Sequence, residues 1–131
     1  MGLIRNYATT LYQWLSQFAP TYREPLNTSI FNDNNPKPLE YITYSADVSN
    51  FGSEFIQAIT IYSQSTSHNK VMDIVDDIES NIGESGIKIK KDWGYITIYK
   101  GSPFYQDKAD EDDTIRAGYV NLLINVYQNK V

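Results

Sequence analysis

Residue types that could carry nucleophilic, acid–base or metal chemistry are sparse in this chain. His68 is the only histidine, and there is no cysteine. A Ser–His relay needs the imidazole within hydrogen-bond reach of a nucleophile and an orienting acid, which the serines of the polar run 63–69 do not by themselves supply. One histidine without cysteine leaves mainly carboxylates as metal ligands, and these do not suit zinc. We interpret His68 as a solvated residue at a helix terminus, and expect no catalytic residue, metal site or cofactor.

A dense group of carboxylates lies in residues 101–113, which we expect to form a loop that projects from the domain. Its acidic residues are Asp107, Asp110, Glu111, Asp112 and Asp113. Carboxylates can ligate Ca²⁺ or Mg²⁺, but their spacing does not match that of the helix–loop–helix calcium site. Two interpretations are favoured over a metal site. The segment is either a mobile hairpin kept in solvent by its like charges or a surface that repels or orients a partner.

A second group of carboxylates lies on a predicted helix. Its members are Asp73, Asp76, Asp77 and Glu79. They fall opposite the apolar stripe of that helix, so we interpret them as a solvated face rather than a paired acid–base site. None of the seven glycines falls into a nucleotide-binding spacing.

Eleven tyrosines are many for a chain of 131 residues. Tyrosine combines a large apolar ring with a polar tip, so it is enriched at protein interfaces, and it is also a good strand former. We expect most of them to pack within the monomer and a subset to lie at a subunit interface. The candidate interface residues are Lys88, Lys90, Tyr99 and Tyr105.

The overall charge excludes some classes of function. The net charge is −5 and the isoelectric point about 4.7. Tight nucleic-acid binding normally needs a basic face, so it is not expected as the main activity. No apolar run reaches the roughly 20 residues of a membrane span, and no signal peptide is recognisable. We expect a soluble, intracellular protein with a single domain over residues 1–131.

The elements that must position these residues follow from hydrophobic periodicity. Apolar spacings of three and four predict helices at 3–18, with Ile4 on the apolar face, and at 71–82. Residues 28–31 are compatible with a short strand. Alternation predicts strands at 39–48, 54–64, 87–91, 93–100 and 114–128.

The order of these elements predicts the fold class. Residues 54–64 are apolar on both faces, which is typical of a central strand that is covered on both sides. Two helices separated by runs of strands predict an α+β fold. We expect a mostly antiparallel twisted sheet of about five to six strands with two helices packed on it.

Taken together, the elements resemble a known family. A helix leads into a proline-bearing loop, then Tyr41-Ile42-Thr43-Tyr44 and Ile59-Thr60-Ile61-Tyr62, an amphipathic helix, and finally Gly118-Tyr119-Val120-Asn121-Leu122-Leu123-Ile124. Over residues 3–127 this arrangement is similar to the tail-terminator and related head–tail joining proteins of tailed bacteriophages and prophages.

The resemblance implies a structural role without catalytic residues. Subunits of that family have an α+β fold and form a ring, commonly a hexamer, at the head-proximal end of the tail tube. The expected partners are further copies of the chain, the tail-tube protein and the head connector, with DNA only as passing cargo. The expected location is the virion tail, assembled in the bacterial cytoplasm, with segment 101–113 facing the channel or a neighbouring ring.

Other functions remain open on the sequence. A head-completion adaptor or a baseplate component would have a similar composition. An acidic inhibitor that mimics DNA would need carboxylates spread along one face at phosphate-like spacing. A small enzyme that uses only carboxylates would need a convergent acidic pair, and the sequence suggests no such pair.

Overall fold

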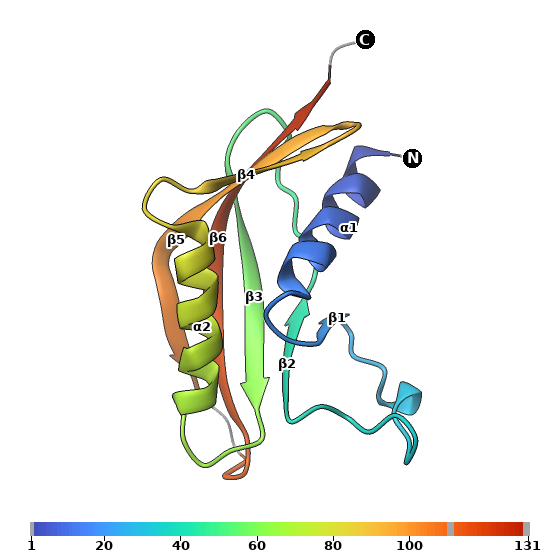
Figure 1. Cartoon of the computed structure of the whole chain (residues 1–131), viewed down its shortest axis with the longest axis vertical. Helices are drawn as coiled ribbons and strands as arrows, with labels where there is room; N and C mark the ends of the chain where they lie inside the picture. The colour runs from blue at the N-terminus through green and yellow to red at the C-terminus, as the bar shows by residue number, and fades with distance from the viewer. Residues whose placement is uncertain (1, 110–111, 130–131) are drawn as a thin grey trace.

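The computed structural model describes residues 2–109 and 112–129, which form two α-helices, a 3₁₀ helix and six strands (Figure 1). The helices are α1 (Leu3–Leu15), η1 (Thr28–Ile30) and α2 (Asn69–Ile82). The strands are β1 (Thr21–Arg23), β2 (Glu40–Tyr44), β3 (Phe55–Ser63), β4 (Ile87–Lys91), β5 (Gly94–Lys108) and β6 (Arg116–Gln128). The α+β class is therefore confirmed, whereas residues 28–31 contain a 3₁₀ turn and not a strand. The Asn27 side chain stabilises that turn by accepting from the Ser29 N–H.

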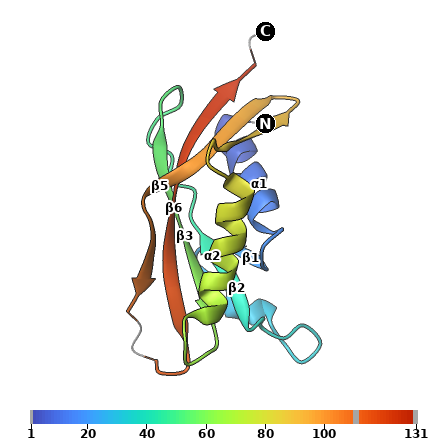
Figure 2. The ribbon, with the colours of Figure 1, turned by 60° about the vertical axis from the view of Figure 1, so that its left-hand side comes forward.

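All six strands form one sheet in the order β1-β2-β3-β6-β5-β4. β1 is parallel to β2 and every other neighbouring pair is antiparallel. The expected mostly antiparallel twisted sheet is wrong, because the sheet is mixed and curls like half a barrel (Figure 2). Residues 24–39 connect the end of β1 back to the start of β2, so both strands run in the same direction. In this pairing the Ile42 N–H donates to the Pro20 carbonyl and the Glu24 N–H to that of Tyr44, each at 2.8 Å.

β5 continues through much of the segment that was predicted to be a loop. Gly101, Ser102 and Pro103 have loop composition, and the register of β5 against β6 shifts between Lys100 and Tyr105. Pairing then resumes, because β6 is long enough to offer partners beyond this irregularity, and it lasts to Lys108. Such an irregularity bends a strand without ending it. The projecting loop 101–113 is therefore a wrong prediction for residues 101–108.

Both helices lie on one face of the sheet, which we call the inner face (Figure 2). α1 buries Tyr7, Leu11, Trp14 and Leu15 against it, while Ile4, predicted on the same apolar face, is 55% exposed in the first turn. The buried side of α2 consists of Val71, Ile74, Val75, Ile78 and Ile82. This confirms the predicted apolar stripe of α2. None of the described helices is long and apolar enough to cross a membrane.

The core is completed by inward-facing strand residues. The apolar ones with exposures of 1% or less are Ile42, Ile59, Ile61, Ile96, Ile98, Val120, Leu122 and Ile124. Each such side chain contributes roughly 1.5–3 kcal/mol by leaving water. On β3 the same alternation leaves Ile56 on the opposite side of the sheet, 47% exposed. The prediction of a central strand is confirmed. Coverage on both faces holds at Thr60, which is 8% exposed, and is wrong at Ile56.

One buried polar residue links α1 to the sheet. Gln57 is fully buried on β3 and accepts a 2.8 Å hydrogen bond from the Tyr7 hydroxyl. Its amide donates to the carbonyls of Ser45 and Ala58 at 2.6 and 2.9 Å. The side chain's hydrogen-bonding groups are therefore partnered inside the core, which offsets the cost of burying an amide.

We expect Tyr7→Phe to lower the free energy of unfolding by about 1–2 kcal/mol, because Gln57 Oε1 would lose its donor in a dry environment. Tyr12→Phe is the matched control on the same helix. Tyr12 is 45% exposed, so its variant should change stability by less than about 0.5 kcal/mol. Urea unfolding monitored by circular dichroism measures both. Equal effects of the two substitutions would contradict the role of the buried hydrogen bond.

Candidate functional site

The side of the sheet opposite the helices, which we call the outer face, is lined by tyrosines. Strand alternation and register place seven of the eleven there: Tyr22, Tyr41, Tyr62, Tyr95, Tyr99, Tyr119 and Tyr127. Cross-strand partners stack, with ring centroids 4.9 Å apart for Tyr41 and Tyr62 and 4.5 Å apart for Tyr95 and Tyr127. Sheet pairing therefore assembles tyrosines from five strands on one face, with a stacked pair at each of two places.

The outer face also concentrates positive charge. Its strand positions carry Lys88, Lys90 and Lys108 and no carboxylate, although the chain has 16 acidic residues. The Lys88 ammonium lies 4.0 Å from the centroid of the Tyr95 ring, and that of Lys108 lies 5.2 Å from Tyr62. These cation–π contacts hold the lysine side chains over the aromatic surface.

An exposed apolar row crosses the middle of this face. Ile56 on β3 is registered with Leu123 on β6, which is registered with Tyr99 on β5. Ile56 is 47% and Tyr99 40% exposed. An apolar centre with aromatic and charged neighbours is the composition of a protein–protein contact surface.

Tyr62 lines two open hollows of about 560 and 350 Å³, the smaller of which is also lined by Glu24, Asp47 and Lys108. The larger one is lined by Glu24, Pro25, Leu26, Tyr41, Thr43 and Tyr62. Glu24 accepts a 2.8 Å hydrogen bond from the Thr43 hydroxyl at its rim. The two hollows make this part of the outer face uneven. Their linings contain no histidine and no pair of hydrogen-bonded carboxylates.

The sequence-predicted interface residues are divided between the two faces. Lys88, Lys90 and Tyr99 lie on the outer face, whereas Tyr105 points to the inner face beside α2. Ile56, Tyr62, Tyr119 and Leu123 belong to the outer face but were not selected from the sequence. The alternation of residues 54–64 does mark Ile56 and Tyr62, but it does not show which face the helices leave open.

The acidic residues 107–113 do not form one loop. Asp107 is part of β5 and is paired with Gly118, whereas Asp112 and Asp113 are exposed in the turn before β6. The Thr114 hydroxyl and N–H donate to Asp112 Oδ1 at 2.6 and 2.8 Å, and these bonds lower the pKa of that carboxyl. Asp112 therefore stabilises the turn above about pH 4, and this contribution fades as the carboxyl is protonated at lower pH. Asp110 and Glu111 lie outside the described residues.

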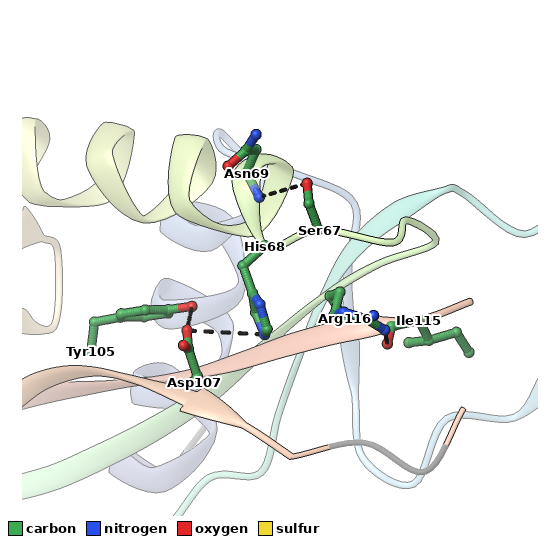
Figure 3. A network of polar contacts seen from close by, with 7 residues as sticks. All are labelled: Ser67, His68, Asn69, Tyr105, Asp107, Ile115 and Arg116. Carbon is green, nitrogen blue, oxygen red and sulfur yellow. Dashed lines mark hydrogen bonds and ion pairs between the residues drawn. The ribbon is translucent and has the colours of Figure 1, made fainter. Parts of the chain in front are cut away.

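His68, Asp107 and Tyr105 form a polar cluster that joins α2 to β5 (Figure 3). The Tyr105 hydroxyl donates to Asp107 Oδ1 at 2.6 Å, and His68 Nε2 lies 4.0 Å from the same oxygen. His68 precedes α2 as predicted, but its ring turns toward the strand. Its side chain is 27% exposed, so the interpretation as a solvated residue holds only in part. Nε2 is buried and has no hydrogen-bond partner among the described residues.

Tyr105 is held in its neutral form. Burial is the main cause that raises its pKa above the ordinary value of 10, and the hydrogen bond to Asp107 adds to it. A raised folded-state pKa means that the phenol contributes stability below pH 10, which is lost as the pH rises through the folded-state value. Its ring covers Gly118, where a Cβ atom would lie 2.9 Å from the Tyr105 hydroxyl oxygen. Glycine at this position allows the ring to reach Asp107.

This cluster has the geometry of a structural link between elements. A general base needs a substrate proton within hydrogen-bond reach, and the buried Nε2 faces Asp107 instead of an open hollow. Among residues 2–109 and 112–129, no group of three or more His, Cys, Asp or Glu side chains could hold a metal ion. The outer face is therefore the stronger candidate for function.

A comparison of the sequence with protein-family models and with curated proteins finds no match.

We expect Asp107→Ala to lower the free energy of unfolding by about 1 kcal/mol, because the Tyr105 hydroxyl would lose its charged acceptor. Asp113→Ala removes an exposed carboxylate of the same acidic segment and serves as the control, with an expected change within about 0.5 kcal/mol. Denaturant unfolding at neutral pH compares the two. A variant of Asp107 as stable as that of Asp113 would show that the cluster does not hold α2 to β5.

Proposed function

We propose that this chain is a structural virion protein that caps the head-proximal end of a phage or prophage tail tube as a ring. In this role it stops tube polymerisation and provides the surface on which the head docks. The observation that carries the proposal is the outer face, where aromatic, apolar and lysine side chains meet on an otherwise acidic chain. Such a surface suits repeated protein–protein contact better than chemistry.

The two sides of the domain are unlike, which supports assembly of a ring. The outer face is aromatic and carries Lys88 and Lys90 on β4, with Glu24 and Asp47 beside Lys108 at its other end, whereas the solvent-facing side of α2 carries Asp73, Asp76 and Asp77. Subunits that contact one another through two different surfaces associate head-to-tail, and a suitable rotation between them closes a ring. The resemblance of residues 3–127 to tail terminators agrees with this arrangement.

The proposed partners are further copies of the chain, commonly six to a ring in that family, the tail-tube protein and the head connector. DNA is proposed only as passing cargo. Carboxylates of the β5–β6 turn, represented by Asp112 and Asp113, would present like charge to its phosphates and so discourage adhesion. The proposed location is the virion tail, after assembly in the bacterial cytoplasm.

Neighbouring roles at the same joint would use similar surfaces. A head-completion adaptor would bind head connectors and leave free tube ends unchanged, and a baseplate component would bind the opposite end of the tube. Electron microscopy of tubes with one end marked by the baseplate therefore distinguishes all three roles.

We expect the purified protein to cap the head-proximal ends of growing tail tubes and to limit their length, which electron microscopy of negatively stained mixtures measures. Ile56→Glu should abolish capping, because it places a charge in the apolar row of the outer face. Ile4→Glu is the control, since Ile4 is 55% exposed on α1 and lies away from that face. Tubes that elongate freely in the presence of the folded wild-type protein would contradict the proposed function.

A further inference from the structure

The outer face leaves apolar side chains uncovered on strands that are otherwise central. β3 and β6 both lie inside the sheet, with a strand on each side, yet the two helices cover only their inner face (Figure 2). Ile56 and Tyr99 are 47% and 40% exposed on the other face. Residues 54–64 have the two-sided apolar composition of a strand covered on both faces. A second layer, which residues 2–109 and 112–129 do not supply over Ile56 and Tyr99, would complete this arrangement.

The solvent-facing side of α2 has the complementary composition. Its Met72 is 41% exposed, and Asp73, Asp76 and Asp77 surround that residue on the exposed surface. Asp73 stands three and four residues from the other two, a spacing at which like charges repel. None of the three forms an ion pair with another described residue, whereas Glu79 is paired with Lys100 at 3.9 Å. An external cation would relieve this repulsion.

The spacing of the two surfaces also agrees. Along α2, Asp76 follows Met72 by four residues, which is about 6 Å of helix rise. Along the sheet, Lys88 is registered with Thr97, two residues from Tyr99 in the apolar row, which is about 6.6 Å of strand. A helix laid across the outer face could therefore place its methionine on the apolar row and its aspartates beside the lysines of β4.

We propose that the outer face binds the α2 surface of a second copy of this chain, with Met72 on the Ile56–Leu123–Tyr99 row and Asp76 and Asp77 opposite Lys88 and Lys90. The contact is heterologous, so each copy offers its outer face to one neighbour and its α2 to the other. This contact would be the subunit interface of the ring, and the ring itself rests on the proposed function.

Charge exchange tests this pairing. Lys88→Glu/Lys90→Glu makes both contact surfaces acidic, and Asp76→Lys/Asp77→Lys makes both basic. Each variant alone should associate roughly 100-fold more weakly than the wild type, because like charges would face each other across the contact. An equimolar mixture of the two variants should associate as the wild type does, since every junction in it is again complementary. Analytical ultracentrifugation over a range of protein concentrations measures these constants.

Lys91→Glu is the matched control on β4. The Lys91 ammonium donates to Gln13 Oε1 of α1 at 3.1 Å, so it belongs to the helix-covered side of the sheet. This variant should associate like the wild type. Circular dichroism and thermal unfolding establish that each variant is folded. Charge-exchanged variants that are folded and self-associate with unchanged constants would overturn the proposal, as would a wild-type chain that stays monomeric at millimolar concentration.

The two proposals fail in different ways. Association that follows the charge exchange, without capping of tail tubes, contradicts only the proposed function. Capped tubes with association that does not respond to the charge exchange contradict only this interface.

Discussion

Burial of the inner face of one curled sheet against α1 and α2 is the interaction on which the rest of the structure depends. The inward-facing residues of five strands and the apolar stripes of both helices enter the same core. Removal of this surface from water is the main favourable contribution to folding, and it has to offset the loss of chain entropy. Because both helices are used on one side (Figures 1 and 2), much of the opposite side around Ile56, Tyr99 and Tyr119 stays exposed for contacts beyond the monomer, although Thr43 and Thr60 on that side are buried.

Polar groups inside the structure serve to align its layers. Gln57 partners Tyr7 of α1, while Trp14 of α1 donates to Asn81 of α2 at 2.9 Å. Tyr105, Asp107 and His68 join β5 to the start of α2. Directional bonds of this kind add little net free energy each, but a mismatch would leave a buried group unsatisfied. They favour one placement of each helix on the sheet, and so they determine which side chains reach solvent.

The outer face and α2 differ in charge although both belong to an acidic chain. Sheet pairing gathers Lys88, Lys90 and Lys108 on the outer face, and helical periodicity gathers aspartates on the solvent side of α2. The domain therefore has two surfaces of different charge, the outer face of the sheet and the solvent side of α2. Long-range electrostatics between such surfaces orients encounter between copies, while apolar contact at the centre supplies affinity.

The sequence alone determined the elements with regular periodicity: both helices, β2, β3, β4, the start of β5, β6 and the α+β class. It could not show that β1 pairs in parallel or that β5 resumes after Gly101–Pro103, because strand pairing depends on partners distant in sequence. It marked Lys88, Lys90 and Tyr99 for an interface but placed Tyr105 with them. Only the tertiary structure decided that both helices pack on one face, because local periodicity describes the surfaces of an element and not what covers them.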